Sequence, residues 1–171
     1  MTMTVTDEYV KNNAEYASTF RGSRPLTPSK GVAVVACMDA RLNVYGVLGL
    51  GDGEAHVIRN AGGVVTADVV RSLAISQRML GTTEIILIHH TDCGMLTFTD
   101  EEFEAAVQQD TGMTPEWSTE AFSDVESDVR QSIERLVASP FLPRKDAIRG
   151  FVFDVASGKL DEVHPADGAG S

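Results

Sequence analysis

Two short apolar runs constrain the fold of this chain more than any other feature. Val32–Ala36 (VAVVA) and Glu84–Ile88 (EIILI) are almost wholly apolar, as strands are when both faces of their sheet are covered. Between them lies a helical pattern over Asp68–Leu80, whose apolar residues recur on one stripe. Strands that alternate with helices indicate an α/β fold with a mostly parallel central sheet flanked by helices.

Capping residues and turns predict the remaining elements. We expect further helices where a capping residue precedes a helical pattern, and strands where short apolar stretches end at glycines or turn residues. The last two strands, which are separated only by a short turn, predict a C-terminal hairpin. The predicted elements are a helix over 7–20 capped by Thr6, a short helix over 43–50, a strand over 56–58, helices that begin with the capping boxes Thr99/Glu102 and Ser123/Glu126, and strands over 149–155 and 159–163.

Length and charge exclude several classes of protein. The 171 residues suit one domain, which we place at residues 1–164, with residues 165–171 predicted to be a disordered tail. There is no apolar run of about 18 residues to cross a membrane. The N-terminus lacks the basic and apolar regions of a signal peptide, which predicts a cytoplasmic protein. Its 14 basic and 25 acidic residues give a net charge of −11, which disfavours nucleic acids and anionic membranes as partners.

Both cysteines lie in motifs that directly follow the two apolar runs. The first motif is Cys37-Met-Asp39-Ala-Arg41, and the second is His90-Thr-Asp-Cys93-Gly. If the two strands are parallel neighbours, both motifs emerge at the carboxyl edge of the sheet, where open α/β sheets bind ligands. Two thiolates and an imidazole are good zinc ligands, and three protein ligands leave tetrahedral zinc one open position. The sequence therefore predicts a catalytic zinc site.

Each of these residues also has a simpler interpretation. A lone cysteine is commonly a small buried hydrophobe, and Cys37 could form a disulfide with Cys93, although a reducing compartment disfavours one. Asp39 and Arg41 could be an ordinary ion pair that steadies a loop. His89 precedes the predicted ligand, but successive strand side chains point to opposite faces, so we expect it to be packed or hydrogen-bonded.

Three motifs together resemble the β-class carbonic anhydrases. They are C-x-D-x-R at residues 37–41, R-N-A-G at 59–62 and H-x-x-C-G at 90–94. The resemblance implies zinc held by Cys37, His90 and Cys93, with Asp39 and Arg41 as a dyad beside it. It implies reversible hydration of carbon dioxide to bicarbonate and a proton by zinc-activated water. It also implies a homodimer or a dimer of dimers, in which the N-terminal helix reaches the partner.

The resemblance leaves some choices open. Ala40 stands where the family often has serine, and His89 stands where glycine is common. Met95, Leu96 and Phe98 could line an apolar pocket, although core positions suit them better. The loop over 59–63 is expected to support Asp39 through backbone amides or to be a plain tight turn.

Other functions fit the same motifs. The first alternative is hydrolysis of carbonyl sulfide or carbon disulfide on the same zinc, and the second is a non-enzymatic zinc or thiol sensor. Two thiolates cancel the charge of the metal and weaken its pull on water, so hydration should rise toward alkaline pH. Release of Asp39 from Arg41 could let it bind the metal and close the site.

Overall fold

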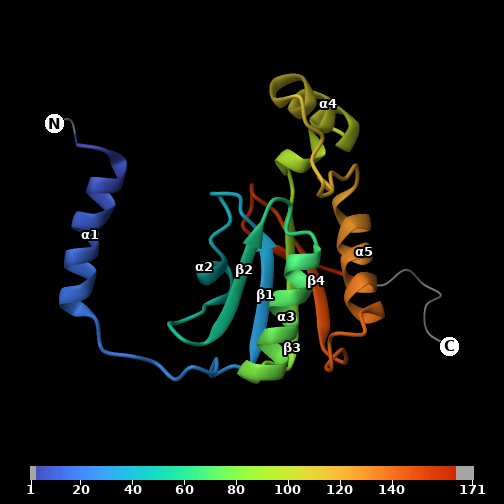
Figure 1. Cartoon of the computed structure of the whole chain (residues 1–171). Coiled ribbons are helices and arrows are strands. Elements are labelled where there is room, and N and C mark those ends of the chain that lie inside the picture. Colours follow the sequence, from blue (N-terminus) through green and yellow to red (C-terminus); the bar gives the residue numbers. More distant parts are fainter. Residues whose placement is uncertain (1–2, 165–171) are drawn as a thin grey trace.

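A five-stranded sheet forms the centre of the computed structural model, which describes residues 3–164 (Figure 1). The spatial order is β2-β1-β3-β4-β5, and the first four of these strands run parallel while β5 is antiparallel to β4. The predicted fold class, including the C-terminal hairpin, is confirmed. The predicted tail, residues 165–171, lies outside the described residues. The strands are β1 (Val32–Cys37), β2 (Ala55–Asn60), β3 (Glu84–His90), β4 (Ile148–Phe153) and β5 (Leu160–Val163).

Helices cover both faces of the sheet, which explains why its strands are so apolar. Helices α3 (Ala67–Leu80) and α5 (Val125–Ala138) pack on one face, and the short α2 (Val44–Leu48) packs on the other. Alternate residues of each strand point to opposite faces, so both sets are buried. One core contains Ala33, Val35, Val69, Leu73, Ile85, Leu87 and Leu136, and the other contains Val34, Ala36, Leu42, Val44, Ile88 and Phe153.

The topology of the sheet brings the two sequence motifs together. Strand β1 pairs in parallel with β3, from Val32 opposite Glu84 to Ala36 opposite Ile88. From β1 the chain moves outward to β2 and then returns to the other side of β1 to form β3. The carboxyl ends of β1 and β3 therefore flank the point at which the chain reverses direction across the sheet, where α/β proteins place their sites.

Both of these strands extend further than predicted. Cys37 is the last residue of β1, opposite Asn60 of β2, and β3 continues through His89 to His90, opposite Phe153 of β4. Apolar character ends sooner than the hydrogen-bond ladder does, because backbone pairing does not require apolar side chains. The predicted ligands Cys37 and His90 are consequently held on strands, not on loops.

Two predicted helix caps are wrong by one or two residues. Helix α1 (Val5–Thr19) is capped by Thr4, not Thr6, because Asp7 lies at the third helical position and completes a capping box with Thr4. Helix α5 is capped by Asp124, whose carboxylate accepts a hydrogen bond from the backbone of Ser127. The predicted box of Thr99 at the start of α4 (Asp100–Thr111) is confirmed.

Helix α1 stands away from the sheet, and α4 projects beyond the carboxyl ends of the strands (Figure 1). Neither helix contains a buried residue. Within residues 3–164, every helix is too short or too polar to cross a lipid bilayer. The cytoplasmic location stays a prediction.

Candidate metal centre

The three predicted metal ligands lie together at the carboxyl edge of the sheet. One sulfur atom each from Cys37 and Cys93 and one ring nitrogen of His90 all lie within 4.8 Å of one another, and the three residues are buried. The two sulfur atoms are 4.0 Å apart. Cys37 ends β1, His90 ends β3, and Cys93 directly precedes a 3₁₀ turn (Gly94–Leu96). The sheet therefore assembles residues that are 56 positions apart in the sequence.

One hydrogen bond determines which nitrogen of His90 faces the cluster. Its Nδ1 lies 2.8 Å from the carbonyl oxygen of Thr91 and must donate, because a carbonyl oxygen only accepts. The Nε2 atom is therefore the one with a free lone pair. It is buried and has no hydrogen-bond partner in the structure. A buried acceptor beside two thiols is expensive to leave unmatched, and a soft divalent cation such as zinc satisfies all three atoms.

The charges within the cluster also suit a cation. A hydrogen bond with Cys93 lowers the pKa of Cys37, and the same contact raises the pKa of Cys93, because the two neighbouring sulfurs share one proton. Burial works to lower the pKa of His90, but the nearby sulfur of Cys37 and the hydrogen bond to the Thr91 carbonyl outweigh burial and raise it. A dication bound among these three groups would favour the deprotonated form of both sulfurs and the neutral form of the imidazole.

Asp39 and Arg41 form a tight ion pair next to the ligands. Asp39 Oδ1 accepts from the backbone N–H and the Nε of Arg41 at 2.8 and 3.0 Å, and Oδ2 accepts from Nη2 at 2.8 Å. These bonds hold the pKa of Asp39 well below its usual range, and they raise the pKa of Arg41. Asp39 Oδ2 also lies 3.6 Å from Nε2 of His90. An ionised carboxylate therefore faces the ligand cluster at neutral pH.

Arg59 supports the first motif in a way that the sequence analysis missed. Its Nε and Nη2 donate to the carbonyl oxygen of Cys37 at 2.9 and 2.7 Å, and Nη2 also donates to the carbonyl oxygen of Asp39 at 2.8 Å. Of the two interpretations of the 59–63 loop, support of Asp39 by backbone amides is not found among the described residues, because the carboxylate of Asp39 accepts from Arg41 instead. The sequence feature that could have indicated this role is the position of Arg59 at the end of a predicted strand, directly before the Asn-Ala-Gly-Gly turn.

Gly63 explains why the loop after β2 needs glycine. Its φ angle is +75°, and a Cβ atom built there would lie 2.8 Å from the backbone nitrogen of Cys37 and 3.0 Å from the carbonyl oxygen of Ile88. No side chain fits at such distances, and positive φ itself favours glycine. The loop therefore packs directly against the strand ends that carry the ligands, and is more than a plain tight turn.

A cavity of about 450 Å³ opens onto the cluster. Cys37, Cys93 and Asp39 form part of its lining, and most of the rest is apolar. Phe98, Phe103 and Trp117, which we call the aromatic wall, line the cavity with successive ring centroids 5.9 Å apart. No sequence pattern pointed to Phe103 and Trp117, because α4 and the segment after it lack an apolar periodicity that would mark an inward face.

The three apolar residues that follow the second motif have different places. Met95 and Phe98 both line this cavity. Met95 is also buried, so a residue here can belong to the core and line the cavity at once. Leu96 is 36% exposed and lines a neighbouring pocket instead.

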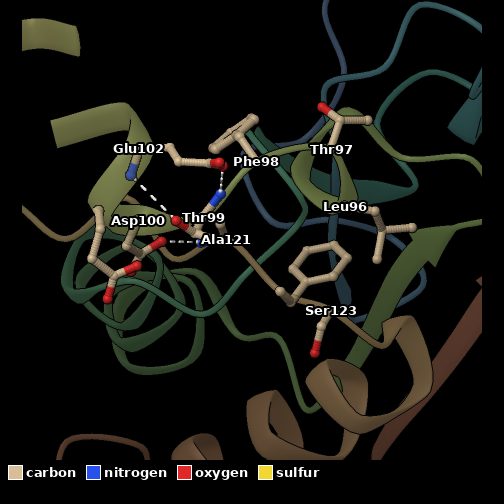
Figure 2. Close-up of a pocket in the computed structure, with 10 residues that line it drawn as sticks. Leu96, Thr97, Phe98, Thr99, Asp100, Glu102, Ala121 and Ser123 are labelled. Carbon is tan, nitrogen blue, oxygen red and sulfur yellow. Dashed lines mark hydrogen bonds between the residues drawn. The ribbon is translucent and has the colours of Figure 1, made fainter. Parts of the chain in front are cut away.

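That neighbouring pocket is lined by more polar than apolar residues (Figure 2). The figure shows Thr99 and Glu102 joined by the two hydrogen bonds of the capping box, and Asp100 accepting from the backbone of Ala121 at 2.7 Å. None of the three clustered ligands lines it. The bond from Ala121 to Asp100 ties the start of α4 to the segment that leads into α5.

His89 lies on the opposite face of β3 from His90, as expected. It is fully buried, and its Nε2 lies 2.7 Å from Asp128 of α5. The strand end that carries His90 is thereby joined to the helix that covers the sheet.

Comparisons with known proteins agree with this site. A protein family described as carbonic anhydrase matches residues 32–160. The chain is 64% identical to β-carbonic anhydrase 1 of Mycobacterium tuberculosis, over 95% of this chain and all of that protein. It is 33% identical to a carbon disulfide hydrolase of Acidithiobacillus thiooxidans, over 77% of this chain and 76% of the hydrolase.

A solved structure extends the likeness to three dimensions. A carbonic anhydrase from Streptococcus mutans superposes with a TM-score of 0.90 at 43% identity, covering 96% of this chain and all of that chain. The family match, the sequence identity and the fold all agree with the three motifs from which the resemblance was first drawn. This chain belongs to the β-class carbonic anhydrases.

Proposed function

We propose that this protein is a carbonic anhydrase that reversibly hydrates carbon dioxide to bicarbonate and a proton, with zinc held by Cys37, His90 and Cys93. The observation that carries the proposal is the unpartnered Nε2 of His90, which lies beside two thiols where a largely apolar cavity opens. Zinc bound by three protein ligands lowers the pKa of a water molecule in its open position and so supplies a hydroxide nucleophile.

Asp39 is placed to orient that nucleophile. Its ionised carboxylate faces the ligand cluster and can only accept hydrogen bonds, so it fixes which way a hydroxyl proton points. With the proton held by Asp39, a lone pair of that oxygen would be left free to face the cavity. Arg41 keeps the carboxylate ionised and in place through its three bonds. The apolar lining suits carbon dioxide, a linear molecule with no net charge.

Stopped-flow hydration of carbon dioxide by the zinc-loaded protein from pH 7 to 9 tests this function. We expect fast hydration that rises toward alkaline pH, because two thiolates weaken the effect of zinc on water. Cys37→Ala should lose both zinc and activity. Asp39→Asn should keep its zinc and lose most activity, which separates chemistry from metal content. A zinc-replete protein that is slow at every pH would overturn the proposal.

Hydrolysis of carbon disulfide or carbonyl sulfide is the second candidate. Met38, Met95 and the aromatic wall make the cavity apolar enough for these molecules, and a relative at 33% identity is named a carbon disulfide hydrolase. We expect hydration of carbon dioxide to be the faster reaction, since the relative at 64% identity is named a carbonic anhydrase. Release of hydrogen sulfide at a higher kcat/KM would reverse that order. Family membership favours either enzyme over the zinc or thiol sensor.

Helix α1 supports a homodimer as the working unit. It buries none of its residues, although it carries large apolar side chains that a monomer would leave in water. A helix with such a face is stable when a partner covers it. We infer that α1 packs on a second copy of this chain. The exposed apolar residues of this region are Val5, Tyr9, Val10, Tyr16 and Phe20.

A further inference from the structure

Arg41 joins the two motifs of the site through two different aspartates. Its Nη1 donates to Oδ2 of Asp92 at 2.7 Å, and its Nη2 donates to the backbone carbonyl oxygen of Asp92 at 2.9 Å. On its other side the same guanidinium donates to both carboxylate oxygens of Asp39. Asp92 lies between His90 and Cys93, so Arg41 links the segment after β1 to the segment that carries two of the ligands.

The hydrogen bonds of the guanidinium are divided equally between these partners. Two of its four side-chain bonds go to Asp39, and two go to Asp92. A guanidinium is planar and rigid, so fixing one edge fixes the direction of the other. The position from which Arg41 reaches Asp39 is therefore set from the side of Asp92.

The backbone of Asp92 is shaped for this contact. Its φ angle is +53°, in the left-handed region that non-glycine residues rarely adopt and that asparagine and aspartate tolerate best. In this conformation the side chain and the carbonyl oxygen of the same residue both meet Arg41.

We propose that Asp92 is a positioning residue, which orients Arg41 so that Arg41 holds the carboxylate of Asp39 at the edge of the ligand cluster. The inference rests on the proposed function. Asp92 would then affect the reaction through Arg41, without itself contacting the substrate or the metal. Without the side chain of Asp92, the guanidinium keeps its bonds to Asp39 and to the backbone carbonyl oxygen of residue 92, but Nη1 loses the partner that fixes its direction.

An ordinary surface ion pair is the simpler alternative. The side chain of Asp92 is 77% exposed, and exposed ion pairs contribute little to stability. The two interpretations differ in what they predict for catalysis. A surface pair can be removed without effect on the reaction, whereas a positioning residue cannot.

Two substitutions at this position separate charge from shape. Asn and Gly both tolerate positive φ, so neither strains the backbone. Asp92→Asn keeps an acceptor and loses the charge, while Asp92→Gly loses the whole side chain. We expect kcat/KM to fall by about 10-fold or more in the glycine variant, as for other groups that orient active-site residues, and by less in the asparagine variant. Asp68→Asn, which breaks an exposed pair with Arg71 elsewhere, is the matched control and should change nothing.

A double-mutant cycle tests whether Asp92 acts through Arg41. In an Arg41→Gln background the Asp92→Gly substitution should have no further effect on kcat/KM. A full and independent effect in that background would overturn the proposal, as would a glycine variant with wild-type kcat/KM.

A readout without activity keeps the test separate from the proposed function. In the metal-depleted protein labelled with ¹⁵N, the Nε–H of Arg41 should exchange with water several-fold faster after Asp92→Gly. Unchanged exchange would also overturn the proposal. If the wild-type protein does not hydrate carbon dioxide while this exchange responds as expected, the proposed function fails and the positioning of Arg41 by Asp92 stands.

Discussion

The guanidinium of Arg59 holds the carbonyl oxygen of Cys37 with two donors, Nε at 2.9 Å and Nη2 at 2.7 Å. This contact runs from one strand to the end of its parallel neighbour, where the first predicted ligand lies. Because Nη2 also reaches the carbonyl oxygen of Asp39, one side chain fixes the backbone on both sides of Met38. The backbone positions of the predicted ligand Cys37 and of Asp39, which we propose orients the nucleophile, thus depend on the same arginine.

Replacement of Arg59 by Met should weaken both metal binding and catalysis. Lys keeps the charge but cannot make the paired contact, so Arg59→Lys should resemble Arg59→Met. We expect zinc affinity and kcat/KM each to fall by about 10- to 100-fold, as for other groups that orient metal ligands. Competition with a chromogenic chelator measures the affinity. Arg71→Met, on the exposed side of α3, is the control. Wild-type behaviour of Arg59→Lys would show that charge alone matters.

Substitution of Gly63 by Ala should destabilise the protein more than the same change at Gly158. Both glycines have a φ of +75°, so both alanines suffer the same backbone strain of about 1–2 kcal/mol. Only at Gly63 does the new Cβ meet the backbone of β1 and β3, which adds about 1–3 kcal/mol. The free energy of unfolding in urea measures the difference. Equal losses at the two sites would contradict the close approach.

Asp39 should make the stability of the metal-depleted protein depend on acid pH. Hydrogen bonds from Arg41 hold the folded-state pKa of Asp39 well below its usual value. An acid with a lowered pKa stabilises the fold above about pH 4, and this contribution is lost as the pH falls below that value. The wild-type protein should therefore exceed Asp39→Asn in stability at pH 7, and the gap should shrink toward pH 3. A gap that is constant over this range would refute the assignment.

Substitutions on α1 should change the oligomeric state without affecting the fold of the sheet. Val10→Asp places a charge on a side chain that is 67% exposed in the monomer and that we place at a dimer contact. We expect it to shift the protein from dimer toward monomer in light scattering, while the far-UV circular dichroism is kept. Lys11→Gln, one residue on, changes the net charge by the same amount and is the control. A wild-type protein that is monomeric at micromolar concentration would exclude the dimer.

Local sequence was sufficient for the elements of the core and for the ligands. The strand patterns, the helix over 68–80 and the final hairpin were all predicted, because burial on both faces of a sheet leaves an apolar pattern that needs no tertiary information. The helix N-caps were predicted less accurately. Ser123 and Asp124 are both capping residues in the sequence, and only the hydrogen bond to Ser127 distinguishes them.

The sequence by itself determined which atoms are available for chemistry: two thiols, an imidazole, a carboxylate and a guanidinium, in motifs placed at strand ends. Only the tertiary structure decided how they are held. Arg59, Asp92 and Gly63 act across strand and loop boundaries, through contacts between residues 20 or more positions apart. Such contacts leave no local pattern, because a side chain that reaches a distant carbonyl is under no periodic constraint. The order of the strands, which no single segment encodes, creates them.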